Sequence, residues 1–371
     1  SVIKIELIDS GISMKKGVDR MKIGFRWYGT EDNIPVEYIR HIPNVDTVVT
    51  AVYSVKVGEV WPMEDILELK EKANKVGLNF HVVESIPVHE DIKLGKRDYK
   101  RYIENYKENI RRCAKAGVKV ICYNFMPVFD WTRSELDHKR EDGSTCLVFY
   151  KDQIKKLDPT KLALPGWDSS YSVEEMAKLI NEYKELGEEG LWKNLEYFLK
   201  EIIPVAIEND VYMAIHPDDP PYSIFGIPRI ITCRDNLRRF LDIYPDKHHG
   251  LTMCAGSLGC DPRNDYISMV KEFGSEGRIH FAHLRNIKIL EDGSFEESGH
   301  ITKEGSLDFS EIVKTYYNLG YKGYFRPDHG RMIWGETGKP GYGLYDRALG
   351  VAYINGLWEM CEKLKGGKNE K

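Results

Sequence analysis

Short β-branched or aromatic runs alternate with amphipathic helical stretches along most of the chain, and this alternation restricts the fold more than any other feature. Eight candidate strands lie at 22–28, 47–53, 79–86, 118–125, 211–216, 250–254, 279–285 and 323–328. Between them lie stretches such as PMEDILELKEKANKVG, RDYKRYIENYKENIRRCAKAG and DFSEIVKTYYNLG, each ending on the glycine that commonly follows a helix. A repeated strand–helix order predicts a parallel sheet covered by helices.

The candidate strands are apolar enough to be buried on both faces, which favours an α/β (β/α)8 TIM barrel. An open doubly wound sheet is the alternative fold. Its nucleotide-binding form is disfavoured, because no GxGxxG follows the first strand and no GxxxxGK[ST] occurs.

Two segments stand outside the regular alternation. Residues 1–20 precede the first strand without a secretion-signal pattern, so we expect an N-terminal extension, either non-native or translated from an upstream start. The gap after strand 4 holds Pro- and Gly-punctuated sequence and then the helical stretches SVEEMAKLINEYKELG and LWKNLEYFLKEIIPVAIEND. We expect residues 21–371 to form a single barrel domain, in which about 130–190 is an inserted lid or oligomer-contact segment.

Composition narrows the class of partner. The charged fraction is 30%, the hydrophobic fraction is 42%, and no apolar run is long enough to span a membrane. The net charge of -5 and the lack of a basic stripe disfavour nucleic acid. The seven cysteines include no CxxC pair and are expected to be reduced thiols. We therefore expect a cytoplasmic protein that binds a small molecule.

Metal-ligand side chains end four consecutive candidate strands. The fifth ends at His216, the sixth at Cys254, the seventh at His283 and the eighth at Asp328. Active-site groups of barrels come from these carboxyl ends. Singly, each residue could be a core histidine, a buried thiol or a capping aspartate, but together at one rim they would be costly to bury unpartnered. We predict that they bind a divalent cation.

The type of ligand suggests which ion is bound. A thiolate with two imidazoles and a carboxylate suits zinc or ferrous iron. If the site also binds an anionic hydroxy acid, five or six coordination is expected, which favours manganese or iron over closed tetrahedral zinc.

Other polar and aromatic side chains follow the strands at the same rim. We predict that Arg26, Trp27, Tyr123, Asn124, Arg285 and Arg331 bind the substrate, with Glu84, His89, Asp130 and His329 nearby. An arginine guanidinium can donate two parallel hydrogen bonds to a substrate carboxylate. The glycine-rich loop WGETGKPGYGLYDRALG adds Tyr342 and Tyr345, either of which could close over the site.

With these motifs assembled, the chain resembles the bacterial mannonate dehydratases of the UxuA type, which are lyases with a xylose-isomerase-like barrel. The resemblance runs from residue 21 to about the C-terminus and rests on FRWYG, GEVWP, ESIPVHEDIK, CYNFMPVFDW, IHPDDPP, MCAGS, HFAHLRN and RPDHG. It implies dehydration of D-mannonate to 2-keto-3-deoxy-D-gluconate in hexuronate (glucuronate) catabolism. The implied metal is Mn2+, with Fe2+ or Co2+ as alternatives.

The resemblance also implies roles for individual residues. His216, Cys254, His283 and Asp328 would be the metal ligands, while His329 and Tyr342 would be catalytic, with Tyr345 as the alternative tyrosine. Dehydration requires removal of the C2 proton and protonation of the departing C3 oxygen, which an acid–base pair beside a metal can provide. We also expect a homo-oligomer, either a dimer or a tetramer.

Two other functions remain open at this point. The first is a metal-dependent sugar or sugar-acid isomerase or epimerase on the same barrel. Mixed carboxylate cages around the metal and a catalytic lysine would favour that function. The second is a non-catalytic sugar-acid binding protein. The cysteine ligand and the arginines favour the dehydratase.

Overall fold

The computed structural model describes residues 20–161 and 171–366, so all of the predicted 1–20 extension except Arg20 lies outside the described residues. The strands are β1 (Lys22–Arg26), β2 (Val45–Thr50), β3 (Asn79–Glu84), β4 (Val120–Tyr123), β5 (Glu135–Lys139), β6 (Thr145–Phe149), β7 (Tyr212–Ile215), β8 (His249–Cys254), β9 (Ile279–His283), β10 (Ile287–Ile289), β11 (Phe295–Glu297) and β12 (Tyr324–Arg326). The α-helices are α1 (Val36–Arg40), α2 (Met63–Lys75), α3 (Glu90–Leu94), α4 (Tyr99–Ala116), α5 (Lys151–Lys156), α6 (Val173–Glu208), α7 (Arg234–Ile243), α8 (Ala255–Gly259), α9 (Tyr266–Ser275), α10 (Phe309–Asn318) and α11 (Leu344–Gly366).

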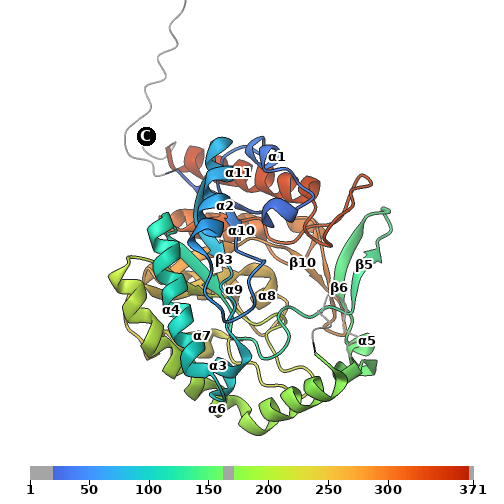
Figure 1. The fold of residues 1–371 in the computed structure, drawn as a ribbon. Coiled ribbons are helices and arrows are strands. Elements are labelled where there is room, and N and C mark those ends of the chain that lie inside the picture. Colours follow the sequence, from blue (N-terminus) through green and yellow to red (C-terminus); the bar gives the residue numbers. More distant parts are fainter. Residues whose placement is uncertain (1–19, 162–170, 367–371) are drawn as a thin grey trace, which may run out of the picture.

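Eight parallel strands close into a barrel in the order β1-β12-β9-β8-β7-β4-β3-β2. Closure is made by β1 and β12, where Lys22 aligns with Tyr324. These eight strands are the ones predicted, and Figure 1 shows helices packed around them. The predicted (β/α)8 barrel is confirmed, and the open doubly wound alternative is wrong.

Apolar side chains lie on both faces of the barrel wall. A cluster within the barrel contains Val49, Val82, Val120, Cys122, Ala214, Phe281 and Tyr324. Residues that alternate with these, such as Val48, Val83 and Ile121, belong to the larger cluster that includes the surrounding helices. Burial on both faces explains why the strands are continuous apolar runs rather than alternating ones.

A second, antiparallel sheet of order β10-β11-β6-β5 lies beside the barrel (Figure 1). Strands β5 and β6 fall within the segment predicted as an insertion, and β10 and β11 follow the seventh barrel strand. Phe295 of β11 aligns with Phe149 of β6, and Thr145 pairs with Met332 beyond β12. This accessory sheet therefore joins the loops that follow β4, β9 and β12. The lid or oligomer-contact role of 130–190 stays a prediction.

The two helical stretches predicted in the gap after the fourth barrel strand together form α6. Ser172 begins this helix with a capping box in which Glu175 is the partner. The backbone leaves the helical region at Gly187, whose φ is 66°, a value that favours glycine. The part beyond Gly187 covers the barrel, since Phe198 packs against Tyr123 of β4.

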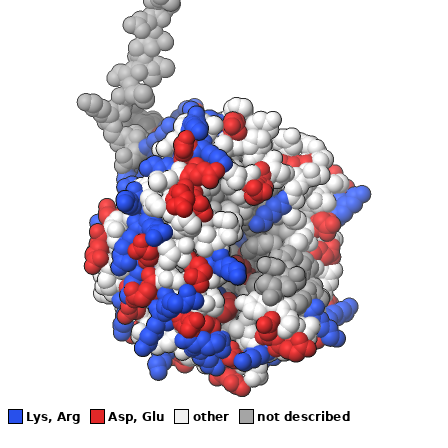
Figure 2. Space-filling view, in the orientation of Figure 1, with Lys and Arg blue, Asp and Glu red and all other residues white. Residues whose placement is uncertain are grey.

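Charges of both signs are mixed across the face of the molecule shown in Figure 2. Among the described helices, none combines the length and the apolar character that a membrane crossing would need.

Candidate metal centre and active site

The register of three barrel strands brings three side chains to the same level. Cys254 ends β8 and aligns with His283 at the end of β9, and His283 aligns with Arg326 at the end of β12. Strand β12 ends two residues before its predicted end, because Pro327 has no N–H with which to continue the ladder. Asp328 therefore lies in the loop after the strand.

The four predicted metal ligands lie close together at the carboxyl ends of the strands. Ligand atoms of His216, Cys254 and His283 lie within 4.8 Å of one another. Asp328 Oδ2 lies 3.4 Å from Cys254 Sγ and 3.7 Å from His283 Nδ1. Two imidazoles, a thiol and a carboxylate form a donor set that fits a divalent transition-metal ion.

Neighbouring groups orient these side chains. His216 Nδ1 lies 2.6 Å from the carbonyl oxygen of Pro217, and donating to it leaves Nε2 as the ligand atom. Arg285 Nε donates to Asp328 Oδ2 at 3.0 Å, while Arg285 Nη2 lies 3.6 Å from Cys254 Sγ. One guanidinium thus contacts both of the ligands that can carry negative charge.

Arginines also fix the charge of the carboxylates. Burial alone would raise the pKa of Asp328, but His329, Arg326 and Arg285 hold that pKa well below its ordinary value. Arg326 Nη2 donates to Glu84 Oε1 at 3.1 Å and lies 3.1 Å from Asp328 Oδ1. Both carboxyl groups are therefore ionised at neutral pH.

The two residues predicted to be catalytic are in contact. His329 Nε2 lies 2.9 Å from the Tyr342 hydroxyl, and His329 Nδ1 lies 3.3 Å from Glu297 Oε1. Tyr345 is 42% exposed and its ring contacts Trp334. Of the two candidate tyrosines, Tyr342 is the one that reaches His329.

These groups line a cavity of about 210 Å³ at the barrel mouth. Its lining residues are Arg26, Tyr28, Tyr53, Glu84, Ser85, Asn124, Met126, Asp130, Trp131, His216, Asp219, Arg326, Asp328, His329, Lys339 and Tyr342. The cavity therefore brings two of the candidate ligands and the histidine–tyrosine pair to a single enclosed space.

Two of the six predicted substrate-binding residues line this cavity, namely Arg26 and Asn124. Arg26 Nη1 lies 3.3 Å from Glu84 Oε1, and Arg26 Nε donates to the Tyr53 hydroxyl at 3.3 Å. Arg285 is fully buried and contacts candidate ligands rather than the cavity.

The other three predicted substrate-binding residues do not line the cavity. Trp27 and Tyr123 are buried in the apolar core. Arg331 Nη2 lies 2.9 Å from Asp346 Oδ1, and Arg331 Nη1 lies 3.2 Å from Asp142 in the β5–β6 turn. Arg331 thus joins the accessory sheet to α11.

Three charged residues at the site are missing from the sequence prediction. A signal for Arg326 was available, since a charged residue in an apolar strand just before a candidate ligand is unusual. Glu297 ends a short strand of the accessory sheet and Lys339 lies in a loop, and neither position has such a signal in the sequence. The Lys339 ammonium lies 3.7 Å from the centroid of the Tyr28 ring, and burial together with Arg26 lowers the pKa of Lys339 to about 8.

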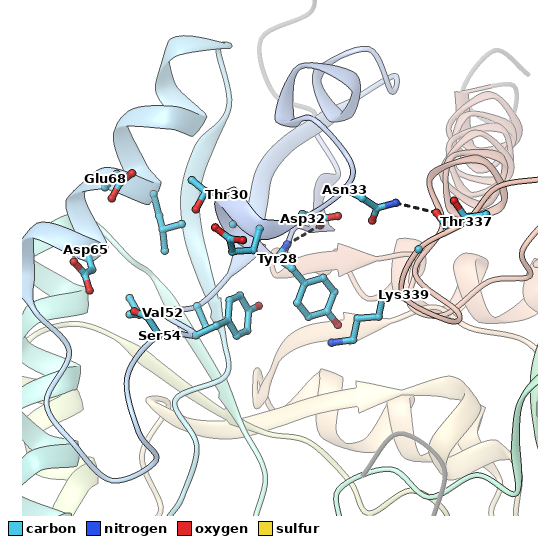
Figure 3. A pocket seen from close by; sticks show the side chains of 16 residues that line it. Tyr28, Thr30, Asp32, Asn33, Val52, Ser54, Asp65, Glu68, Thr337 and Lys339 are labelled. Atoms are coloured by element: carbon cyan, nitrogen blue, oxygen red, sulfur yellow. Dashed lines mark hydrogen bonds between the residues drawn. The ribbon is translucent and has the colours of Figure 1, made fainter. Parts of the chain in front are cut away.

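A larger cleft, of about 780 Å³, adjoins the cavity and shares Tyr28, Tyr53 and Lys339 with it. Figure 3 shows Lys339 extending toward Tyr28 from the loop that carries Thr337. Asn33 donates to the Thr337 carbonyl at 2.8 Å and ties this loop to the segment after β1. The cleft and the cavity therefore lie side by side.

The fold and the site together define a (β/α)8-barrel enzyme with a candidate metal centre at the strand ends. The family model for D-mannonate dehydratase (UxuA) matches residues 21–368, so the chain belongs to this family of metal-dependent hydro-lyases.

Individual proteins agree with the family assignment. The chain is 53% identical over 341 residues to mannonate dehydratase 2 of Halalkalibacterium halodurans, which covers 91% of this chain and 99% of that protein. The crystal structure of a mannonate dehydratase from Streptococcus suis serotype 2 has a TM-score of 0.88 at 49% identity, covering 94% of this chain and 97% of that one. An L-ribulose 3-epimerase structure, with a TM-score of 0.54 at 12% identity over 95% of this chain and 99% of its own, shares the fold alone.

Proposed function

We propose that this chain dehydrates D-mannonate to 2-keto-3-deoxy-D-gluconate and water, as a step of hexuronate catabolism. The observation that carries this proposal is the convergence of four metal-ligand side chains and the His329–Tyr342 pair at one barrel mouth. The identity to mannonate dehydratases over most of the chain supports the choice of substrate.

His216, Cys254, His283 and Asp328 would hold the divalent cation. When bound, the ion would draw electron density from the carboxylate and hydroxyl oxygens of the substrate and so make the C2 proton more acidic. The oxygen donors of a hydroxy acid favour Mn2+, with Fe2+ or Co2+ as alternatives.

We assign the two proton transfers to His329 and Tyr342. Burial raises the pKa of Tyr342, although Arg326 and Arg26 oppose this, so the hydroxyl stays protonated near neutral pH. His329 Nε2 accepts the C2 proton, and the electron pair of the C2–H bond forms the C2=C3 bond. The C3–O bond then breaks with its electron pair on oxygen, which takes the Tyr342 proton and leaves as water.

The contact between His329 and Tyr342 provides a way to restore their starting protonation states. After water leaves, His329 carries an extra proton and Tyr342 lacks one. Their atoms are 2.9 Å apart, so the proton can pass directly from Nε2 to the phenolate oxygen. The enol product becomes the 2-keto acid by moving its C2 hydroxyl proton to C3.

Arg26, Asn124 and Lys339 are the substrate-binding residues that we propose. All three line the cavity, and the two cationic side chains can donate to carboxylate or hydroxyl oxygens. Lys339 also lines the larger cleft, and we infer that it contacts the substrate as the substrate enters from that side.

The test is an assay of metal-stripped protein with added Mn2+ and D-mannonate, with altronate and gluconate as controls. We expect 2-keto-3-deoxy-D-gluconate from mannonate alone, and failure with every divalent ion would reject the proposal. Tyr342→Phe should lower kcat by roughly 100-fold or more, as for loss of a general acid. Tyr345→Phe is the matched control and should keep most of the activity.

A further inference from the structure

A carboxylate from outside the barrel contacts His329. Glu297 ends β11 of the accessory sheet, and its side chain is fully buried. Its Oε1 lies 3.3 Å from His329 Nδ1. The same oxygen accepts from Arg285 Nη1 at 2.5 Å and from Arg133 Nη2 at 2.7 Å. The accessory sheet therefore brings a negative charge to the side of the imidazole that faces away from Tyr342.

This contact determines which ring nitrogen of His329 is protonated. A carboxylate oxygen can only accept a hydrogen bond, so Nδ1 must carry the hydrogen. Nε2 then keeps its lone pair and can accept from the Tyr342 hydroxyl at 2.9 Å. The rings of Trp131 and Tyr342 pack against the imidazole edge to face, with centroids 5.6 Å and 4.8 Å away, and restrict its rotation.

Glu297 holds a proton poorly, so it is suited to orienting the histidine and not to relaying protons. Burial alone would raise the pKa of Glu297, but Arg285 and Arg133 keep it below the ordinary value. Asp219 also pairs with both arginines, at 2.8 Å and 2.9 Å. The contact with His329 is therefore an addition to a cluster whose charges are already paired.

We propose that Glu297 is a positioning residue for the dehydration, which keeps His329 as the Nδ1–H tautomer and so leaves the Nε2 lone pair on the side of the ring that faces Tyr342 and the cavity. This inference rests on the proposed role of His329 in proton transfer. The accessory sheet would then contribute to catalysis through Glu297, because without this carboxylate the imidazole of His329 could adopt the other tautomer.

The test compares Glu297→Gln with Glu296→Gln in the Mn2+-loaded enzyme. Glutamine has the same shape but can turn its amide N–H toward Nδ1, which favours the wrong tautomer. We expect Glu297→Gln to lower kcat by about 10- to 100-fold, as for other outer carboxylates that orient a histidine, with KM for mannonate and bound metal unchanged. Glu296→Gln makes the same change at the preceding residue of β11, whose side chain contacts the Tyr150 hydroxyl and not His329, and it should keep kcat within about 3-fold of wild type.

Mannonate deuterated at C2 separates a positioning role from a structural one. If proton abstraction is impaired, the isotope effect on kcat should be larger in Glu297→Gln than in wild type. A smaller fraction of folded enzyme would lower kcat and leave the isotope effect unchanged, which would overturn the proposal, as would full activity of Glu297→Gln. An inactive wild-type enzyme would overturn the proposed function itself, so the two failures are distinguishable.

Discussion

At the scale of single residues, buried arginines surround the candidate ligands. Arg285 contacts Cys254 and Asp328, and Arg326 contacts Asp328 and Glu84. A buried guanidinium is costly unless it is paired, and both of these face carboxylates. Since Asp328 is already ionised at neutral pH, metal binding need not remove a proton from it.

The cationic side chain of Lys339 should contribute to substrate binding. We expect Lys339→Met to raise KM for mannonate roughly 10-fold, as for loss of a charge-assisted hydrogen bond, with kcat little changed. Because the lowered pKa of Lys339 is about 8, its charge is present below that pH and lost above it. Wild-type KM should therefore rise above pH 8, whereas the KM of Lys339→Met should not respond in that range.

Steady-state kinetics between pH 6.5 and 9.5 would check this prediction. Lys155→Met changes an exposed lysine of α5 and is the matched control. Equal KM values for Lys339→Met and Lys155→Met at pH 7 would contradict the assignment.

The site residues that could be predicted from sequence are those fixed by the ends of barrel strands. His216, Cys254 and His283 could be predicted to lie together, because parallel strands bring their carboxyl ends to one rim. Tyr123 was predicted together with its chain neighbour Asn124, although successive side chains near a strand end tend to point in opposite directions. The structure has Asn124 at the cavity and Tyr123 in the core. Lys339 depends on a loop conformation that no local pattern specifies.

At the scale of secondary-structure elements, two turns of identical sequence shape the accessory sheet. EDGS occurs at 141–144 and again at 291–294. The glycines have φ values of 82° and 81°, and each turn closes with a backbone hydrogen bond to its serine carbonyl, at 2.9 Å and 2.8 Å. Asp-Gly between apolar runs is a hairpin signal, so both hairpins could have been predicted. The pairing of the two hairpins with each other could not have been predicted, because it joins segments that are far apart in the sequence.

Two buried histidines at the amino ends of β8 and β9 should make the barrel sensitive to acid. Burial lowers the pKa of His280 to about 3 and that of His249 to about 4. A histidine with a lowered folded-state pKa stabilises the fold fully above its unfolded pKa of about 6.5, and this stability is lost as pH falls below that value. The free energy of unfolding should fall by about 1 kcal/mol per histidine by pH 5.5.

Urea denaturation at pH 7.5 and 5.5 would measure this loss. His280→Gln keeps a donor for the Lys247 carbonyl, which His280 Nε2 contacts at 2.6 Å, but it cannot be protonated. We expect this variant to lose less stability than wild type on acidification. An identical loss in both proteins would exclude His280 as a source of the acid sensitivity.

At the scale of the whole molecule, the candidate ligands lie at or just beyond the carboxyl ends of four consecutive strands of the barrel wall, β7, β8, β9 and β12. An ion that binds only the folded chain should stabilise it by about 2.7 kcal/mol at a concentration a hundredfold above Kd. Scanning calorimetry of metal-stripped protein should therefore show a higher Tm when Mn2+ is added. The increase should be largely lost in Cys254→Ser and kept in Cys260→Ser, and equal increases in both variants would contradict the ligand assignment.

Closure of the barrel by β1 and β12 has a consequence for synthesis of the chain. Strand β1 can pair with β12 only after β12 has been synthesised, and Asp328 follows β12 by only two residues. Until the ribosome reaches residue 254, His216 is the only one of the four candidate ligands that has been made. A nascent chain can therefore offer an ion only an incomplete shell. We therefore expect a metal ion to bind at the end of translation or later, when the barrel and the four candidate ligands are completed together.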